Sequence, residues 1–94
     1  MLSATIAAGA FKVPVRIRNL SETGAMIEGA TFPPLGTILT LYRADLEITA
    51  TVIWIAVGRC GIAFIGRASV DEWVAGVRRP GGQEERGQTR VDAI

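Results

Sequence analysis

The sequence predicts an all-β fold, a six-stranded antiparallel β-barrel with one C-terminal α-helix. The 94 residues, 49% hydrophobic and 20% charged, suit a single domain with one core. Before Pro80 the hydrophobic residues recur at every second position, the period of half-buried antiparallel strands. Glycines and prolines divide this pattern into six short stretches, and closing them into a barrel removes the exposed edges of a flat sheet.

The strands follow from this alternation and from the turn residues between them. Alternation is explicit over residues 2–8, 13–17 and 46–54, and the shorter strands are predicted at 24–28, 37–42 and 61–65. The breaks fall at Gly9, Gly24, Gly29, Pro33-Pro34, Gly36 and the stretch 57–59. By parity, Asn19 and Trp54 belong to the inward faces of their strands, and we expect Trp54 to lie in the core.

One helix is predicted after the last strand. Ser69 is an N-cap, and Glu72 three residues later completes a capping box. The helix carries an apolar stripe, and two arginines precede the proline that stops it: Val70, Trp73, Val74 and Val77, then Arg78, Arg79 and Pro80. Gly76 inside this helix costs about 1 kcal/mol relative to alanine, so packing must hold the helix on the barrel, as a plug over one opening.

Composition changes at Pro80. Residues 80–94 have few apolar side chains and no hydrophobic period, so we expect a flexible tail after a domain spanning residues 1–79. There is no histidine, and Cys60 is the only cysteine, so no histidine-based catalysis, metal site or disulfide is expected. We therefore expect no enzyme, no catalytic residues and a reduced, cytoplasmic protein.

Net charge and hydropathy limit the classes of partner that this chain is expected to bind. The formal net charge is +1, without the basic excess of a DNA- or RNA-binding protein. The longest apolar stretch, residues 48–57, is too short to insert across a membrane, and no secretory signal is expected at the N-terminus. Ile53, Ile55 and Val57 break the alternation of their strand and predict either a helix-docking surface or a dimer contact, so the oligomeric state stays open.

The turn after the second strand reads N-x-S-x-x-G, with Asn19, Ser21 and Gly24 at its defined positions. A structural interpretation is available, because Asn and Ser cap backbone groups in turns and Gly supplies a positive φ. Further along, residues 52–64 form a hairpin with Trp54 on one arm and a Gly-Ile-x-Phe sequence on the other. We expect Cys60 in this hairpin turn, where neighbouring Arg59 would lower its pKa.

The order of strand, N-x-S-x-x-G turn, apolar strand, hairpin and capped helix resembles the PilZ domain family over roughly residues 2–79. These are small β-barrels that receive the bacterial second messenger cyclic di-GMP. The resemblance implies a non-catalytic signalling module whose regulatory ligand is cyclic di-GMP, with no other cofactor. It implies that Asn19 accepts a hydrogen bond from a guanine edge, that Ser21 adds a polar contact, and that Gly24 lets the ligand approach the backbone.

The family's second ligand-binding motif, R-x-x-x-R, precedes its first strand, where this sequence has only Met1. Cyclic di-GMP is a dianion, and each charge-assisted arginine bond contributes about 1.5–3 kcal/mol, so we expect weak binding without that pair. Two hypotheses follow. Either the chain is a receptor that borrows arginines from elsewhere in the chain, from a partner or from an omitted N-terminal extension, or it is a protein–protein adaptor that no longer binds nucleotide.

The nearest candidates for borrowed arginines are Arg16 and Arg18, which point away from the inward face of their strand. A bulge is needed before Arg18 and Asn19 can converge on one ligand. Arg78 and Arg79 could also turn toward it. The alternative is that the strand arginines form a solvated face and that the helix arginines satisfy the end of their own helix. Trp73, on the helix stripe, is expected in the core.

Overall fold

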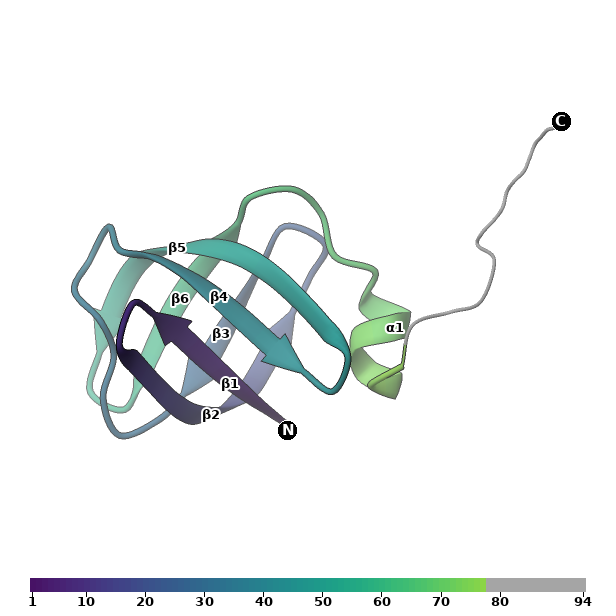
Figure 1. Cartoon of the computed structure of the whole chain (residues 1–94), viewed down its shortest axis with the longest axis horizontal. Coiled ribbons are helices and arrows are strands. Elements are labelled where there is room, and N and C mark those ends of the chain that lie inside the picture. The colour runs from purple at the N-terminus through teal and green to yellow at the C-terminus, as the bar shows by residue number, and fades with distance from the viewer. Residues whose placement is uncertain (78–94) are drawn as a thin grey trace, which may run out of the picture.

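The computed structural model describes residues 1–77, and over this range the predicted fold is confirmed. Six antiparallel strands close into a barrel in the order β1-β2-β3-β6-β5-β4 (Figure 1). Their bounds are β1 Leu2–Ala8, β2 Phe11–Leu20, β3 Gly24–Glu28, β4 Ile38–Arg43, β5 Leu46–Ala56 and β6 Arg59–Phe64. Residues 80–94, predicted as a flexible tail, lie outside the described residues.

The barrel interior is apolar because the inward positions of each strand carry apolar side chains. Among the described residues no polar or charged residue is buried. The largest fully buried side chains come from all six strands: Ile6, Ile17, Ile27, Leu39, Leu41, Val52, Cys60 and Ile62. Burial of these side chains is what drives the strands to close around one core.

Two β-bulges interrupt the alternation. The register of β2 against β3 shifts between Ile17 and Asn19, and that of β5 against β6 shifts between Val52 and Trp54. One extra residue turns every later side chain to the opposite face of its strand. Asn19 is therefore exposed. The prediction that Trp54 lies in the core is wrong, since 40% of this residue is exposed on the outer face.

The helix α1, Val70–Ala75, begins at the predicted N-cap, where the Ser69 hydroxyl accepts a hydrogen bond from the Glu72 amide at 3.4 Å. It ends earlier than predicted. Gly76 is its C-cap, in the left-handed region with φ 74°, rather than an interior residue. The positive φ explains the glycine, because other residues adopt this conformation at a cost. Arg78 and Arg79 fall outside the described residues.

Arg43, at the end of β4, binds the carbonyl groups at the end of α1. Its Nε donates to the Trp73 carbonyl at 2.6 Å and its Nη2 to the Val74 carbonyl at 3.2 Å, while Nη1 reaches the Ser3 carbonyl at 3.0 Å. A single guanidinium thus joins α1 to β1 and β4. The sequence missed this contact, because it links residues thirty or more positions apart.

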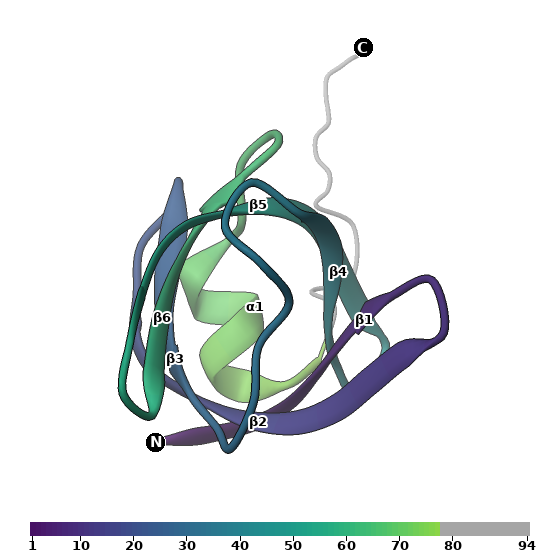
Figure 2. The same ribbon diagram turned by 90° about the vertical axis from the view of Figure 1, so that its left-hand side faces the viewer.

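The helix covers one end of the barrel: Figure 1 places α1 at that end, and Figure 2 shows it framed by the ring of strands. Trp73 is 3% exposed and belongs to the core, as predicted. Val74 and Val77 are exposed, so the rest of the predicted stripe is only partly packed. A six-residue helix is too short to be stable alone, and Trp73 supplies its one buried contact with the barrel.

Cys60 lies within β6 and is fully buried, not in the hairpin turn as predicted. The expected effect of Arg59 is wrong in sign, because burial raises the pKa of the Cys60 thiol from 9.0 to about 11. Removing a thiolate from water disfavours the charged form. The side chain behaves as a small hydrophobic residue of the core.

We expect native Cys60 to resist alkylation at pH 8 and to react once urea unfolds the chain. Above pH 9 the unfolded thiol ionises while the folded thiol stays protonated, so the unfolded state binds fewer protons and stability falls as pH rises from 9 toward 11. Urea unfolding of the native chain and of Cys60→Ala across this range measures the effect. The variant should show a smaller pH-dependent loss, and identical slopes would contradict the burial.

Candidate functional site

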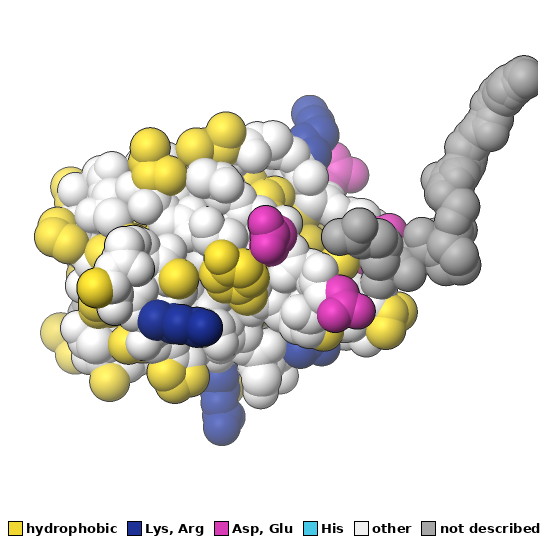
Figure 3. Space-filling model, in the orientation of Figure 1, with side chains coloured by type: hydrophobic (Ala, Val, Ile, Leu, Met, Phe, Trp, Pro, Cys, Tyr) yellow, Lys and Arg dark blue, Asp and Glu magenta, His cyan; other side chains and the backbone are white. Residues whose placement is uncertain are grey.

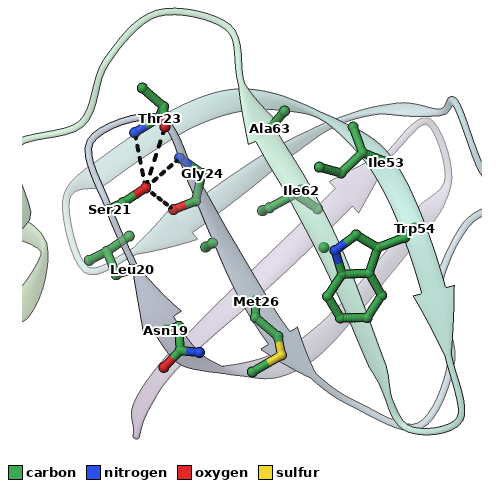
Figure 4. Close-up of a pocket in the computed structure, with 12 residues that line it drawn as sticks. Asn19, Leu20, Ser21, Thr23, Gly24, Met26, Ile53, Trp54, Ile62 and Ala63 are labelled. Carbon is green, nitrogen blue, oxygen red and sulfur yellow. Dashed lines mark hydrogen bonds between the residues drawn. The ribbon is translucent and has the colours of Figure 1, made fainter.

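The turn between β2 and β3 is held by the hydroxyl of Ser21. This Oγ accepts hydrogen bonds from the amides of Gly24 at 3.2 Å and Thr23 at 3.3 Å, and the Ser21 amide donates to the Gly24 carbonyl at 2.9 Å (Figure 4). Ser21 therefore performs the structural role that the motif suggested. Its side chain remains at the surface, so the hydroxyl borders the outer face while it shapes the turn.

A glycine is required at position 24 because a side chain would not fit there, and not because of the backbone conformation. Its φ is not positive, so the turn interpretation of this glycine is wrong. A Cβ built on Gly24 would lie 2.6 Å from the carbonyl oxygen of Ile62, in the neighbouring strand β6. The glycine thus lets β3 and β6 pair closely next to the turn.

The same turn is bound to the segment that leads into α1. The Phe64 amide donates to the Thr23 carbonyl at 2.8 Å, and the Ala68 amide donates to the Glu22 carbonyl at 2.9 Å. Arg67 and Glu22 add an exposed ion pair at 2.6 Å. Two backbone hydrogen bonds therefore fix the turn, one to the last residue of β6 and one to the chain between β6 and α1.

Four residues form a continuous row across the outer face of the barrel, here called the pocket row. In register they are Asn19 on β2, Met26 on β3, Gly61 on β6 and Trp54 on β5. Both bulges are needed for this row. The bulge in β2 turns the side chain of Asn19 to the outer face, and the bulge in β5 does the same for Trp54. A Cβ on Gly61 would overlap the indole of Trp54, so the glycine allows the ring to lie over β6.

The pocket row and the Ser21 turn line a surface pocket of about 420 Å³, drawn in Figure 4. Its apolar lining includes Met26, Ile53 and Trp54, and its polar side chains are Asn19, Ser21 and Thr23. No charged residue lines it, and no hydrogen bond joins the side-chain amide of Asn19 to another described residue. A flat, partly apolar group with hydrogen-bonding edges fits this chemistry, since an indole stacks on bases and an amide both donates and accepts.

The predicted arginines lie beside this pocket rather than in it. Arg16, Glu28 and Arg59 are partners in the next row of the outer face, here called the arginine row. Rows on one face of a strand are about 7 Å apart, within reach of an arginine side chain. Arg16 lines a different surface pocket, together with Ser3, Pro14 and Glu28. Arg18, at the bulge, is paired with the carboxylate of Glu28.

The predicted site residues therefore divide into two groups. Asn19, Ser21 and Gly24 share one pocket, and the expected bulge before Asn19 is present. Arg16 and Arg18 lie one row away from the pocket. Arg59 lies there too, and the sequence did not predict it as a site residue because residues 57–59 were expected to form a turn. Its position two residues before Gly61 on the same strand was the available signal. With three guanidinium groups and one carboxylate, this area is positively charged overall.

The described residues contain no group of three or more His, Cys, Asp or Glu side chains that could hold a metal ion. In the same range, every helix is too short and too polar to cross a membrane.

Comparison with known protein families matches residues 1–76 to the PilZ domain. No curated protein and no solved structure matches the chain.

Proposed function

The chain belongs to the PilZ domain family of non-catalytic cyclic di-GMP receptor modules, and from this premise we propose that it binds cyclic di-GMP weakly, on the pocket row, as a bacterial signalling module. The observation that carries the proposal is the uninterrupted row of Asn19, Met26, Gly61 and Trp54 beside the Ser21 turn. It combines an aromatic side chain with a free amide at the two ends of one pocket.

The guanine part of the ligand suits the pocket row. An indole contributes about 1–3 kcal/mol when it stacks on a base, and the position of Trp54 over Gly61 leaves part of its surface exposed. Asn19 supplies a carbonyl and an amino group for the edge of the base. Ser21 acts mainly by shaping the turn, because its hydroxyl is already bonded to the amides of Thr23 and Gly24.

The phosphates would meet the arginine row. Arg16 and Arg59 supply positive charge there, and Arg18 could join them only by leaving Glu28. An arginine that must leave a carboxylate to bind a phosphate contributes less binding free energy than an arginine that has no partner to leave. The described residues thus offer single arginines on strands instead of a paired clamp, which supports weak binding by the 94-residue chain.

We expect calorimetric titration of the full chain with cyclic di-GMP to give a Kd weaker than ~10 μM, because within residues 1–77 no paired arginines line the pocket. Ser21→Ala and Arg18→Ala should weaken binding further, by loosening the turn and by removing one cation. Lys12→Ala is the matched control, since Lys12 is an exposed cation near Thr5 and Tyr42, away from the pocket. Submicromolar affinity would overturn the weak-binding proposal, and unchanged affinity in both site variants would place the ligand elsewhere.

The sequence repeats the family's arginine spacing once, at Arg86 and Arg90, outside the described residues. The double variant Arg86→Ala/Arg90→Ala tests whether the chain borrows these side chains. If the native chain binds below micromolar and the double variant does not, the C-terminal segment supplies the clamp. Equal affinity of the two chains excludes that source.

The second candidate function is a nucleotide-independent adaptor in the cytoplasm that acts through a protein partner. The observation that favours it is the Arg18–Glu28 ion pair, which neutralises an arginine that a nucleotide would need. Complete lack of cyclic di-GMP binding at near-millimolar concentration, in a chain that unfolds cooperatively, would support the adaptor. A binding signal that is lost on replacing Asn19 would support the receptor.

A further inference from the structure

The end of the barrel opposite α1 exposes large aliphatic side chains. They are Leu35, Ile38, Ile55 and Val57, here called the apolar end, and Ile53, which also lines the pocket, borders them. Figure 3 shows hydrophobic side chains gathered at the end of the barrel away from the helix. The two chain segments that supply them, residues 30–42 and 48–58, contain no charged residue. Contiguous apolar surface of this kind marks an interaction site more often than a solvated face.

These residues are neighbours because a loop is bonded to β5. The Gly36 amide donates to the Val52 carbonyl at 2.8 Å, and the Val52 amide donates to the Thr37 carbonyl at 3.0 Å. Ile38 is in register with Thr51, two residues before Ile53. The β3–β4 loop and the last third of β5 therefore form one surface. The helix-docking interpretation of Ile53, Ile55 and Val57 is wrong for α1, which lies at the other end.

One edge of β5 is left without a strand at this surface. Pairing between β4 and β5 ends at Ile38 and Thr51, and the loop bonds reach only Val52, whereas β5 pairs with β6 as far as Ala56. Within residues 1–77, nothing pairs in register with the outer edge of residues 53–56. Edge strands are usually protected by lysine, proline or a short length. Residues 53–57, Ile-Trp-Ile-Ala-Val, have no charge and no proline.

We propose that a second copy of this chain occupies the apolar end, with the free edges of the two β5 strands pairing antiparallel near Ile55. Such a contact is isologous, so each copy offers the same edge and covers the same aliphatic side chains. Self-pairing of an uncharged segment places no like charges opposite each other, which removes the usual obstacle to edge-to-edge association. The inference does not depend on nucleotide binding.

Sedimentation of the full chain from dilute to near-millimolar concentration tests the proposal. We expect a concentration-dependent dimer, and we expect Ile55→Lys or Val57→Lys to weaken its Kd at least about tenfold, because a charge on the edge must be desolvated. Ile65→Lys is the matched control, since Ile65 is 56% exposed and lies beside the Ser21 turn at the opposite end. This variant should dimerise like the native chain.

Hydrogen exchange of the native chain provides a second readout that needs no variant. The Ile55 amide should become more protected as concentration rises, whereas exposed amides near Ile65 should not. A chain that sediments as a monomer at every concentration would overturn the proposal. So would a dimer that Ile55→Lys leaves unchanged, or a different protein that binds this edge while the chain alone stays monomeric.

Discussion

Replacing Trp73 by alanine is expected to lower the free energy of unfolding by about 3–5 kcal/mol, the usual cost of removing a buried tryptophan. Trp73 is 3% exposed and is the one buried residue of α1. Without it, six helical residues keep the Ser69 cap and the Arg43 contacts but lose their apolar anchor. A small domain has only about 5–15 kcal/mol of stability, so much of it would be lost.

Urea unfolding followed by circular dichroism measures this change, and the fluorescence of Trp54 reports on the outer face in the same experiment. Val74→Ala is the matched control, because the adjacent Val74 is 53% exposed and its truncation should change stability by no more than about 0.5 kcal/mol. If Trp73→Ala and Val74→Ala unfold at the same urea concentration, α1 does not close the barrel as described.

Replacing Gly24 by alanine is expected to destabilise the chain by about 1–3 kcal/mol and to weaken ligand binding in the pocket. The new methyl group would meet the carbonyl oxygen of Ile62, which is backbone and cannot rotate away. Strand β3 must then move from β6, and the turn that Ser21 holds moves with it. Urea unfolding and titration with cyclic di-GMP measure the two effects.

Gly61→Ala is the matched comparison, since it adds the same methyl group to the next row of the same face. Here the obstacle is the indole of Trp54, an exposed side chain that can rotate at a cost of about 0.5–1.5 kcal/mol. We therefore expect a smaller loss of stability but a clear change in Trp54 fluorescence and in ligand binding. Equal stability losses in the two variants would contradict the backbone contact at Gly24.

The local sequence pattern predicted the beginning of α1 correctly and its end incorrectly. The capping box located the beginning of α1 correctly, because an N-cap depends on residues only three positions apart. The end was misplaced, because the valine pattern continues beyond Gly76 while the chain has already turned at this residue. The arginine that binds the last carbonyl groups is Arg43, whose approach depends on the closure of β4 against β1.

The sequence by itself determined the six strands, the apolar interior and the turn at Asn19, Ser21 and Gly24, because alternation and turn chemistry are local properties of the chain. Only the tertiary structure decided that Asn19 and Trp54 share one outer row and that Arg59 stands beside them. A bulge exists only in the pairing of two strands, so no single strand reveals it. The free edge of β5 likewise became visible only once the neighbouring strand β4 was seen to end before it.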